Sequence, residues 1–455
     1  MVILYSIDLS PPCRAVLMAA RVINLNLDVH ETNLLKNEHK TEQFLKLNPQ
    51  HTIPTIDDDG FILWDSHAII RYLVSKYAKD DSLYPKDLQK RAIIDQRLHF
   101  EGEMLFVRLR NIVRPIFYNK VKKFNEENIN LAHETCEILD KFLEGKKWLA
   151  GDNFTLADIS CVSTVSSYPA FLSLDKYKNI VAWLKKCENE IPGYAETNAP
   201  GATKFIKAIK SLARIQFNKL RLYKLSVIQY NTLRRHTNNM VRPILYFGIW
   251  SPPSSAVRMT AKAIGLDLDL REINLFKKDH LKDDYLKINP QHTIPVFNDD
   301  GFVISDSHAI MTYMVDKYAE NDNLYPKDLK KRAIVNQSLH YSGGVIFCRL
   351  LGALQPLLRG TTKTVSPASQ QFLEDSYKYM NTILDGRKWL AGDSYTLADI
   401  SSITAISSVT VFKSINDYPN LINWMKNCQE LPGYPDIAAV GIKEFHDLVS
   451  QRLEK

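Results

Sequence analysis

Ser10 begins the run SPPC at residues 10–13, which follows a short apolar stretch and opens a pattern typical of a helix. A hydroxyl at such a helix start lies beside free backbone amides and the positive end of the helix dipole, where a thiolate is stabilised. The spacing is that of a Cys-x-x-Cys redox pair with the first thiol replaced. The run returns as SPPS at residues 251–254, without a thiol. This argues against a dithiol redox role and leaves each serine as either a helix cap or a group that holds a thiolate.

A second set of polar residues could bind a charged peptide. Asp65 and Ser66 start a helix pattern, so they offer a carboxylate for an ammonium group and a hydroxyl with free amides for a carboxylate. His51 precedes a proline turn and His39 lies in the loop after the second predicted strand, and either could bind a second carboxylate. A ligand with an amino group, two carboxylates and a thiol is glutathione. A lone histidine is more often structural, so the combination carries this interpretation.

Residues 48–74 are predicted to position these groups. Residues 53–56 and 61–64 are short apolar runs on either side of an Asp-Asp-Gly turn, where Gly60 can take the positive φ of a hairpin. Ser66 is predicted to cap the following helix, whose apolar residues recur at helical spacing. Pro54 occupies a position suited to a tight turn and open to a cis peptide bond.

The same segment returns at residues 289–315, within a much larger repeat. Ser10 matches Ser251, Asp65 matches Asp306, and WLAGD at residues 148–152 matches WLAGD at 389–393, all at one constant offset. The period is a whole domain pair and not the roughly 20 to 50 residues of a solenoid repeat. The sequence therefore predicts a tandem duplication.

Each copy is predicted to contain two domains. The first eighty residues follow the order β-α-β-α-β-β-α, and their strand, helix, strand unit must cross over in parallel. Helices alone follow, predicted at residues 87–118, 125–143, 156–168, 180–189 and 203–212. We expect α/β domains at 1–80 and 241–321, helical domains at 87–213 and 328–455, and a linker at 214–240. Thr155 and Asp158 have the spacing of a capping box, which favours a structural over a catalytic aspartate.

Composition limits the class of protein. The 455 residues are 45% hydrophobic and 24% charged, without a secretory signal or an apolar run near eighteen residues, so we expect a cytoplasmic protein with no membrane span. The six cysteines show no repeated pair spacing, which argues against disulfides and zinc. The net charge of the protein is +7. Residues 197–266 contain lysines and arginines but no Asp or Glu, so the excess positive charge is concentrated in this segment. That basic segment is interpreted as a solvated connector, in preference to a nucleic-acid or membrane site.

Several ordered motifs together resemble a known family. The runs LSPPCRAV, NLLKNEH, NPQHTIP, DSHAI, LYPKD and TLADIS are similar to the insect cytosolic glutathione transferases of the delta and epsilon classes, closest to epsilon. The resemblance covers both copies and leaves out only the connector. It implies a thioredoxin-like domain that binds glutathione and a helical domain that forms a pocket for the electrophile.

The resemblance also implies roles for individual residues. Ser10 and Ser251 would be catalytic, each donating a hydrogen bond to the glutathione sulfur and favouring the thiolate. The glutathione site would comprise His39, His51, the backbone of Ile53 beside a cis Pro54, Asp65 and Ser66, and in the second copy His280, His292, Ile294 with Pro295, Asp306 and Ser307. The electrophile pocket would include Phe106 and Arg110, and in the second copy Phe347 and Leu351. The second copy thus lacks one arginine, and its Ser254-Ser255 in place of Cys13-Arg14 puts its full activity in doubt.

The predicted function is conjugation of glutathione to hydrophobic electrophiles, as in detoxification of xenobiotics including insecticides, with peroxidase or dehydrochlorinase activity as possible accessories. Glutathione would be a co-substrate, and no cofactor or metal is expected. The two copies would pair within one chain or between chains as a homodimer. A non-catalytic ligand binder or scaffold of the same fold is the alternative. The connector could also be the seam of two neighbouring genes read as one.

Overall fold

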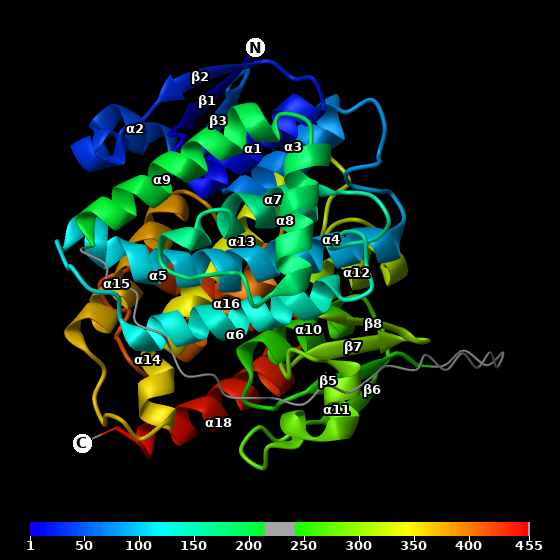
Figure 1. Ribbon diagram of the computed structural model, residues 1–455. Helices are drawn as coiled ribbons and strands as arrows, with labels where there is room; N and C mark the ends of the chain where they lie inside the picture. The colour runs from blue at the N-terminus through cyan, green and yellow to red at the C-terminus, as the bar shows by residue number, and fades with distance from the viewer. Residues whose placement is uncertain (214–241, 454–455) are drawn as a thin grey trace.

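The computed structural model describes residues 1–213 and 242–453, and the predicted linker at 214–240 lies outside the described residues. Two four-stranded sheets lie at opposite sides of the molecule with helices between them (Figure 1). The first sheet contains β1 Val2–Ser6, β2 Leu27–Glu31, β3 Thr55–Asp58 and β4 Phe61–Trp64, in the order β2-β1-β3-β4. Strands β1 and β2 are parallel and β3 runs antiparallel to β1, which confirms the predicted crossover.

Three helices accompany this sheet: α1 Pro11–Val22, α2 Glu42–Leu47 and α3 Ser66–Tyr77. The hairpin strand predicted at 53–56 instead begins at Thr55, and a cis Ile53–Pro54 bond precedes it. Gly60 has the expected positive φ of 79°. The predicted cap Ser66 is wrong. Asp65 caps α3, its Oδ1 accepting from the amides of His67 at 3.0 Å and Ala68 at 3.1 Å. Both residue types cap well, so type alone could not separate adjacent candidates.

The rest of the first half is helical. It contains α4 Leu88–Phe100, α5 Phe106–Tyr118, α6 Glu126–Leu143, α7 Leu156–Val165, α8 Lys178–Glu190 and α9 Ala199–Leu212. A π-helical turn at Glu101–Leu105 joins α4 to α5, so they run on as the single long helix expected. The capping box of Thr155 and Asp158 is present at the start of α7, and every residue of that helix is buried. Helix α7 therefore forms the centre of the helical core.

The second half repeats this order. Its sheet, β6-β5-β7-β8, has the same parallel and antiparallel pairs. The elements are β5 Ile244–Phe247, α10 Pro252–Ala263, β6 Asp269–Glu272, α11 Asp283–Ile288, β7 Val296–Asp299, β8 Phe302–Ser305, α12 Ser307–Tyr318, α13 Leu329–Tyr341, α14 Cys348–Leu358, α15 Pro367–Ile383, α16 Leu397–Val409, α17 Pro419–Gln429 and α18 Ala439–Ser450.

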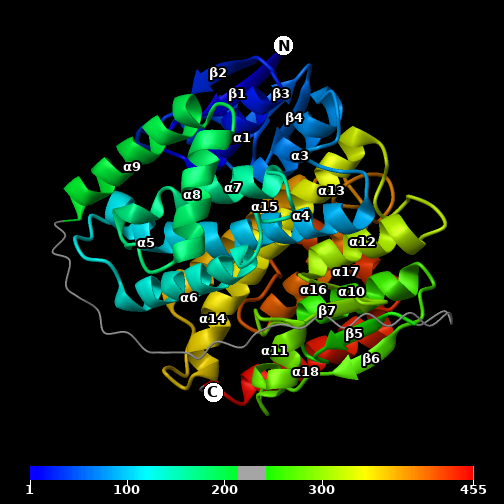
Figure 2. The ribbon, with the colours of Figure 1, turned by 45° about the vertical axis from the view of Figure 1, so that its right-hand side comes forward.

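The halves pack against each other through reciprocal contacts. Helix α3 lies on α13 and α4 lies on α12 (Figure 2). The Trp64 amide donates to Gln337 Oε1 at 3.0 Å, and Gln96 Nε2 donates to the Ser305 carbonyl at 3.0 Å. Gln96 and Gln337 occupy equivalent places in the two copies, as do Trp64 and Ser305. The chain thus has the two-fold arrangement of an isologous dimer within one polypeptide.

One helical run among the described residues, Leu329–Leu358, is long and apolar enough to cross a membrane by length and composition alone. It comprises α13, a π-helical turn and α14, and its most apolar window has a mean hydropathy of 1.2. This window is 44% buried inside the molecule, and core helices of soluble proteins pass the same test. The expectation that no apolar run approaches eighteen residues missed it because polar residues such as Arg349 interrupt the run.

Candidate functional site

Ser10 and Ser251 occupy the N-cap positions of α1 and α10, but their hydroxyls are engaged differently. The Ser10 side chain makes no capping hydrogen bond, whereas Ser251 Oγ accepts from the Ser254 amide at 3.4 Å. Ser10 is partly exposed and Ser251 is buried. The Ser251 hydroxyl therefore acts as a helix cap, whereas the Ser10 hydroxyl does not.

The thiol beside Ser10 is not suited to be a nucleophile. Cys13 is fully buried, and burial raises the pKa of its thiol although the Ser10 hydroxyl opposes this shift. Because the thiolate is the reactive form, a neutral buried thiol is inert. This agrees with the argument against redox chemistry at the run SPPC.

The turn before the hairpin lies close to these helix starts. Ile53 packs in a small apolar cluster with Cys13 and with Ile7. In the second half, a Cβ placed on Gly248 would lie 2.6 Å from Ile294 Cδ1 and 3.8 Å from Ser251 Cβ. The structure therefore brings Ile294 near Ser251, and both Ile-Pro bonds are cis as expected.

Each half also brings its two predicted histidines together. The ring centroids of His39 and His51 are 6.0 Å apart, and those of His280 and His292 are 6.1 Å apart. Burial lowers the pKa of all four rings, which favours their neutral form. Nδ1 of His39 and of His280 is buried without a hydrogen-bond partner in the described part of the chain. A ligand acceptor can satisfy that atom.

The acidic corner of the site lies at the start of α3 and α12. Ser66 and Ser307 are the first helical residues, and both are buried. Asp306 caps α12 as Asp65 caps α3, with Oδ1 accepting from the His308 and Ala309 amides at 3.0 and 2.9 Å. Burial and the neighbouring Glu103 of the first half raise the pKa of Asp306 to about 7. The two halves thus share this corner.

Comparison with known proteins agrees with this arrangement. The glutathione S-transferase N-terminal domain matches residues 4–81 and 245–322, and the glutathione S-transferase C-terminal domain matches 100–190 and 353–432. Glutathione S-transferase 1 of Manduca sexta is 43% identical over 202 residues, which are 44% of this chain and 92% of that protein. The chain belongs to the glutathione S-transferase family.

Other insect glutathione S-transferases match in the same way. Glutathione S-transferase D7 of Anopheles gambiae is 41% identical over 203 residues, 44% of this chain and 93% of that protein. An epsilon-class glutathione S-transferase structure from Musca domestica is 45% identical, covering 47% of this chain and 98% of that one, with a TM-score of 0.45. The duplication of the transferase fold is confirmed, and the curated relatives are insect glutathione S-transferases, as the resemblance implied.

The predicted electrophile residues lie at or just after the π-helical turn of each transferase copy. Phe106 and Arg110 lie on α5, Phe347 ends the second π-helical turn, and Leu351 lies on α14 against the second core. Burial lowers the pKa of Arg110, whose charged neighbours include Arg349 of the second half. Arg110 therefore lies close to where the halves meet, and its role in binding an electrophile stays a prediction.

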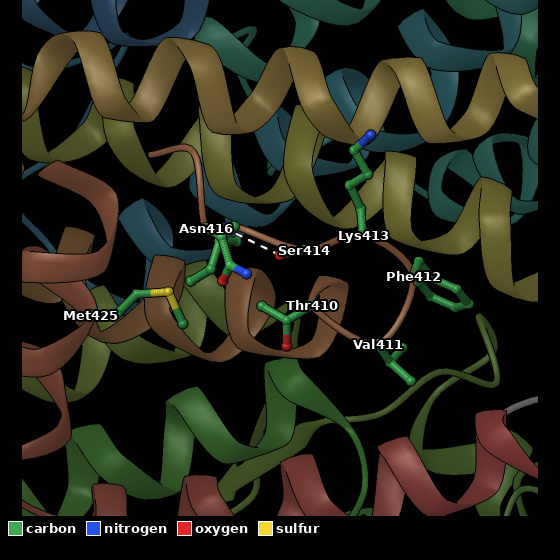
Figure 3. A pocket seen from close by; sticks show the side chains of 8 residues that line it. Thr410, Val411, Phe412, Lys413, Ser414, Asn416 and Met425 are labelled. Atoms are coloured by element: carbon green, nitrogen blue, oxygen red, sulfur yellow. Dashed lines mark hydrogen bonds between the residues drawn. The ribbon is translucent and has the colours of Figure 1, made fainter. Parts of the chain in front are cut away.

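A hollow of about 500 Å³ lies elsewhere, after α16 of the second copy (Figure 3). Residues 410–416 and Met425 line it, and none of them is a predicted site residue. Lys413 points away from the hollow in this view. The hollow therefore adds nothing to the glutathione site.

Sequence reasoning missed the residues that each half contributes to the other. Glu103 approaches Asp306 and His308, and Gln337 accepts from the Trp64 amide beside Asp65. Alignment of the two copies could have pointed to Glu103, because Glu101 and Glu103 of the first copy are replaced by Ser342 and Gly344 in the second. The first copy therefore carries two carboxylates that the second copy lacks, but the sequence did not show which residues these carboxylates contact.

Proposed function

We propose that each half of this glutathione transferase binds one glutathione and conjugates its thiolate to a hydrophobic electrophile. The observation that carries this proposal is the Ser10 hydroxyl, which stands at the N-cap of α1 without a capping bond. Ile53, which precedes the cis proline, packs on Cys13 of the same helix. A hydroxyl placed there can donate to the sulfur, and the helix start favours the anion.

The remaining polar groups would hold the peptide. We propose that His39 and His51 bind one carboxylate, that Ser66 at the start of α3 binds the other, and that Asp65 binds the ammonium group. The corresponding residues of the second half would act in the same way. The unpartnered Nδ1 atoms of His39 and His280 support this assignment. Phe106 and Arg110, with Phe347 and Leu351, would contact the electrophile.

The serines are tested by Ser10→Ala combined with Ser251→Ala. Lowering a thiol pKa by ~2 units corresponds to roughly 2.7 kcal/mol, so loss of that effect reduces the thiolate at neutral pH by up to ~100-fold. We expect conjugation of a chlorinated aromatic compound to fall strongly, while calorimetry still detects glutathione binding. Unchanged turnover would remove the serines from the mechanism. Absence of turnover in the unsubstituted chain, with binding retained, would favour the non-catalytic binder.

We infer further that the working unit is one chain whose halves pair with each other. The reciprocal bonds between Trp64 and Gln337 and between Gln96 and Ser305 support this arrangement. Tethered partners reach an effective concentration near the millimolar range, which favours the internal pair over a second chain. The described cysteines are all free, which supports a reducing, cytoplasmic place of action in detoxification.

A further inference from the structure

Three arginines from opposite halves of the chain meet beside α15. Arg110 and Arg114 lie on α5 of the first half, and Arg349 lies on α14 of the second. The guanidinium carbons of Arg114 and Arg349 are 5.2 and 6.0 Å from the centre of the same ring, that of Phe372 on α15. Burial lowers the pKa of Arg110, and the charges of Arg349 and Arg114 lower it further. We call Arg110, Arg114 and Arg349 the arginine cluster.

The arginine cluster has little negative charge around it. Among the described residues, neither Arg110 nor Arg114 forms a hydrogen bond or an ion pair through its side chain. Cys348 is a further neighbour of Arg110, but burial raises the pKa of its thiol to about 12, so this thiol is neutral. Asp375 is a charged neighbour of Arg349, yet the two form no ion pair in the part of the chain that the structure describes. Because like charges repel each other, a cluster of this kind favours an anionic ligand.

Arg349 is held in place by second-half residues and acts on the first half. Its Nη1 donates to the Phe372 carbonyl at 2.7 Å and to Ser376 Oγ at 2.8 Å. These bonds fix the guanidinium and leave its Nε and Nη2 edge for a ligand, the edge that binds a carboxylate through two bonds. Burial lowers the pKa of His51 in the proposed glutathione site of the first half, and Arg349 is among the charges that lower it further. The second half thus brings a positive charge near the first site.

We propose that the arginine cluster selects electrophiles that carry a carboxylate, and that it serves the site of the first half. This inference rests on the proposed conjugation of glutathione and names the substrate class of the electrophile that Arg110 would contact. A guanidinium binds a carboxylate through paired hydrogen bonds that are roughly twice as strong as neutral ones. The Phe372 ring is 38% exposed and offers an apolar surface to the body of the ligand. The cluster therefore fits an aromatic carboxylate that bears a leaving group.

The equivalent place across the pseudo-two-fold axis keeps one of the three charges. Leu351 and Gln355 of the second half replace the two arginines of α5, and Leu131 of the first half replaces the shared aromatic ring. Arg108 keeps the charge that corresponds to Arg349. We therefore expect the second half to prefer neutral electrophiles, so that one chain conjugates two classes of substrate.

The test compares two matched electrophiles, para-chlorodinitrobenzoate and the neutral para-chlorodinitrobenzamide, in the full chain. With either compound the glutathione sulfur bonds to the ring carbon, and chloride leaves with the electron pair of the carbon–chlorine bond. Ser251→Ala leaves the first site as the main source of turnover, and Ser10→Ala leaves the second. We expect the ratio of kcat/KM for the acid to kcat/KM for the amide to be at least ~10-fold higher in Ser251→Ala than in Ser10→Ala. Added salt should lower this ratio, because it screens the charges.

Variants of the cluster locate this preference. Arg110→Leu combined with Arg114→Gln gives the first half the residues of the second, and Arg349→Gln removes the charge supplied across the halves. We expect each change to lower kcat/KM for the acid at least ~10-fold while kcat/KM for the amide changes little. Arg359→Gln is the control, because Arg359 is a second-half arginine whose Nη1 is already paired with Glu127 Oε1 of the first half at 2.6 Å. It should leave the ratio unchanged.

The outcomes separate this inference from the function on which it rests. Equal loss with both electrophiles in the cluster variants, or the same ratio in Ser10→Ala and Ser251→Ala, would overturn the selection of carboxylates while leaving conjugation intact. Absence of turnover with both electrophiles in the unsubstituted chain would instead contradict the proposed function and the inference with it.

Discussion

Asp58 is a buried residue at the end of β3, and its carboxylate accepts three hydrogen bonds. It accepts from Lys76 Nζ at 2.6 Å and from the hydroxyls of Tyr72 and Tyr77 at 2.8 and 2.7 Å. Burial alone would raise its pKa, but these hydrogen bonds together lower it. Asp299 has the same partners and the same direction of shift in the second half. Each carboxylate joins the sheet to the following helix.

Combining Asp58→Asn with Asp299→Asn should therefore lower stability in a pH-dependent way. A depressed folded-state pKa contributes stability above the unfolded pKa of about 4, and that contribution disappears as the pH falls through the folded value. We expect a loss of roughly 1–3 kcal/mol per site at pH 7 that shrinks toward pH 3. Unfolding temperatures measured across this range report it. A difference independent of pH would contradict the ionic explanation.

At the scale of the element, α7 depends on one buried carboxylate. Asp158 Oδ1 accepts from the Leu149 amide and from Trp183 Nε1, both at 3.0 Å, and Oδ2 accepts from the Thr155 amide at 3.0 Å. It therefore ties the start of α7 to the preceding loop and to α8. The equivalent Asp399 makes the same three bonds in the second half.

Asp158→Ala would leave three buried donors without an acceptor. Because each unsatisfied donor costs about 1–3 kcal/mol, we expect a loss of ~3 kcal/mol or more in the free energy of unfolding of the first half. Asp152→Ala, at an exposed position of the same loop, is the control and should stay within about 0.5 kcal/mol. Denaturant unfolding measures both. Full stability with lost conjugation would instead revive a catalytic role for Asp158.

At the scale of the whole molecule, the two halves are similar but their paired surfaces are not interchangeable. The first half presents Glu103 to His308 of the second half, which has Gly344 in the corresponding place. Glu103 occupies the space above Gly343, where an added Cβ would clash with its carboxylate. Pairing of two first halves would bring like charges together, which favours the internal pair.

We therefore expect the intact chain to have a solution mass of 52.2 kDa, independent of concentration. Light scattering coupled to size-exclusion chromatography across a wide concentration range measures this. A mass of twice that value would show that the halves pair between chains. The same intact mass in protein from the source tissue would exclude a seam between two separately expressed genes.

The sequence by itself determined the duplication, the order of helices and strands, and the family. These follow from signals within a few residues: apolar periodicity, turn glycines, capping boxes and short motifs. Local signals also placed Ser10 and Ser251 at helix starts, His39 in the loop after the second strand, and His51 before the proline turn. They could not separate Asp65 from Ser66 as the cap, because both residue types accept amide bonds equally well.

Only the tertiary structure decided what depends on packing between distant residues. The Ser10 hydroxyl is free of capping while its counterpart Ser251 caps, although the two runs read almost alike. The arginine cluster of Arg110, Arg114 and Arg349 forms only when the halves pair, because α5 and α14 belong to opposite halves of the chain. Side-chain periodicity reports which face of a helix is buried and not which partner covers it, so pairing of the halves had to be seen.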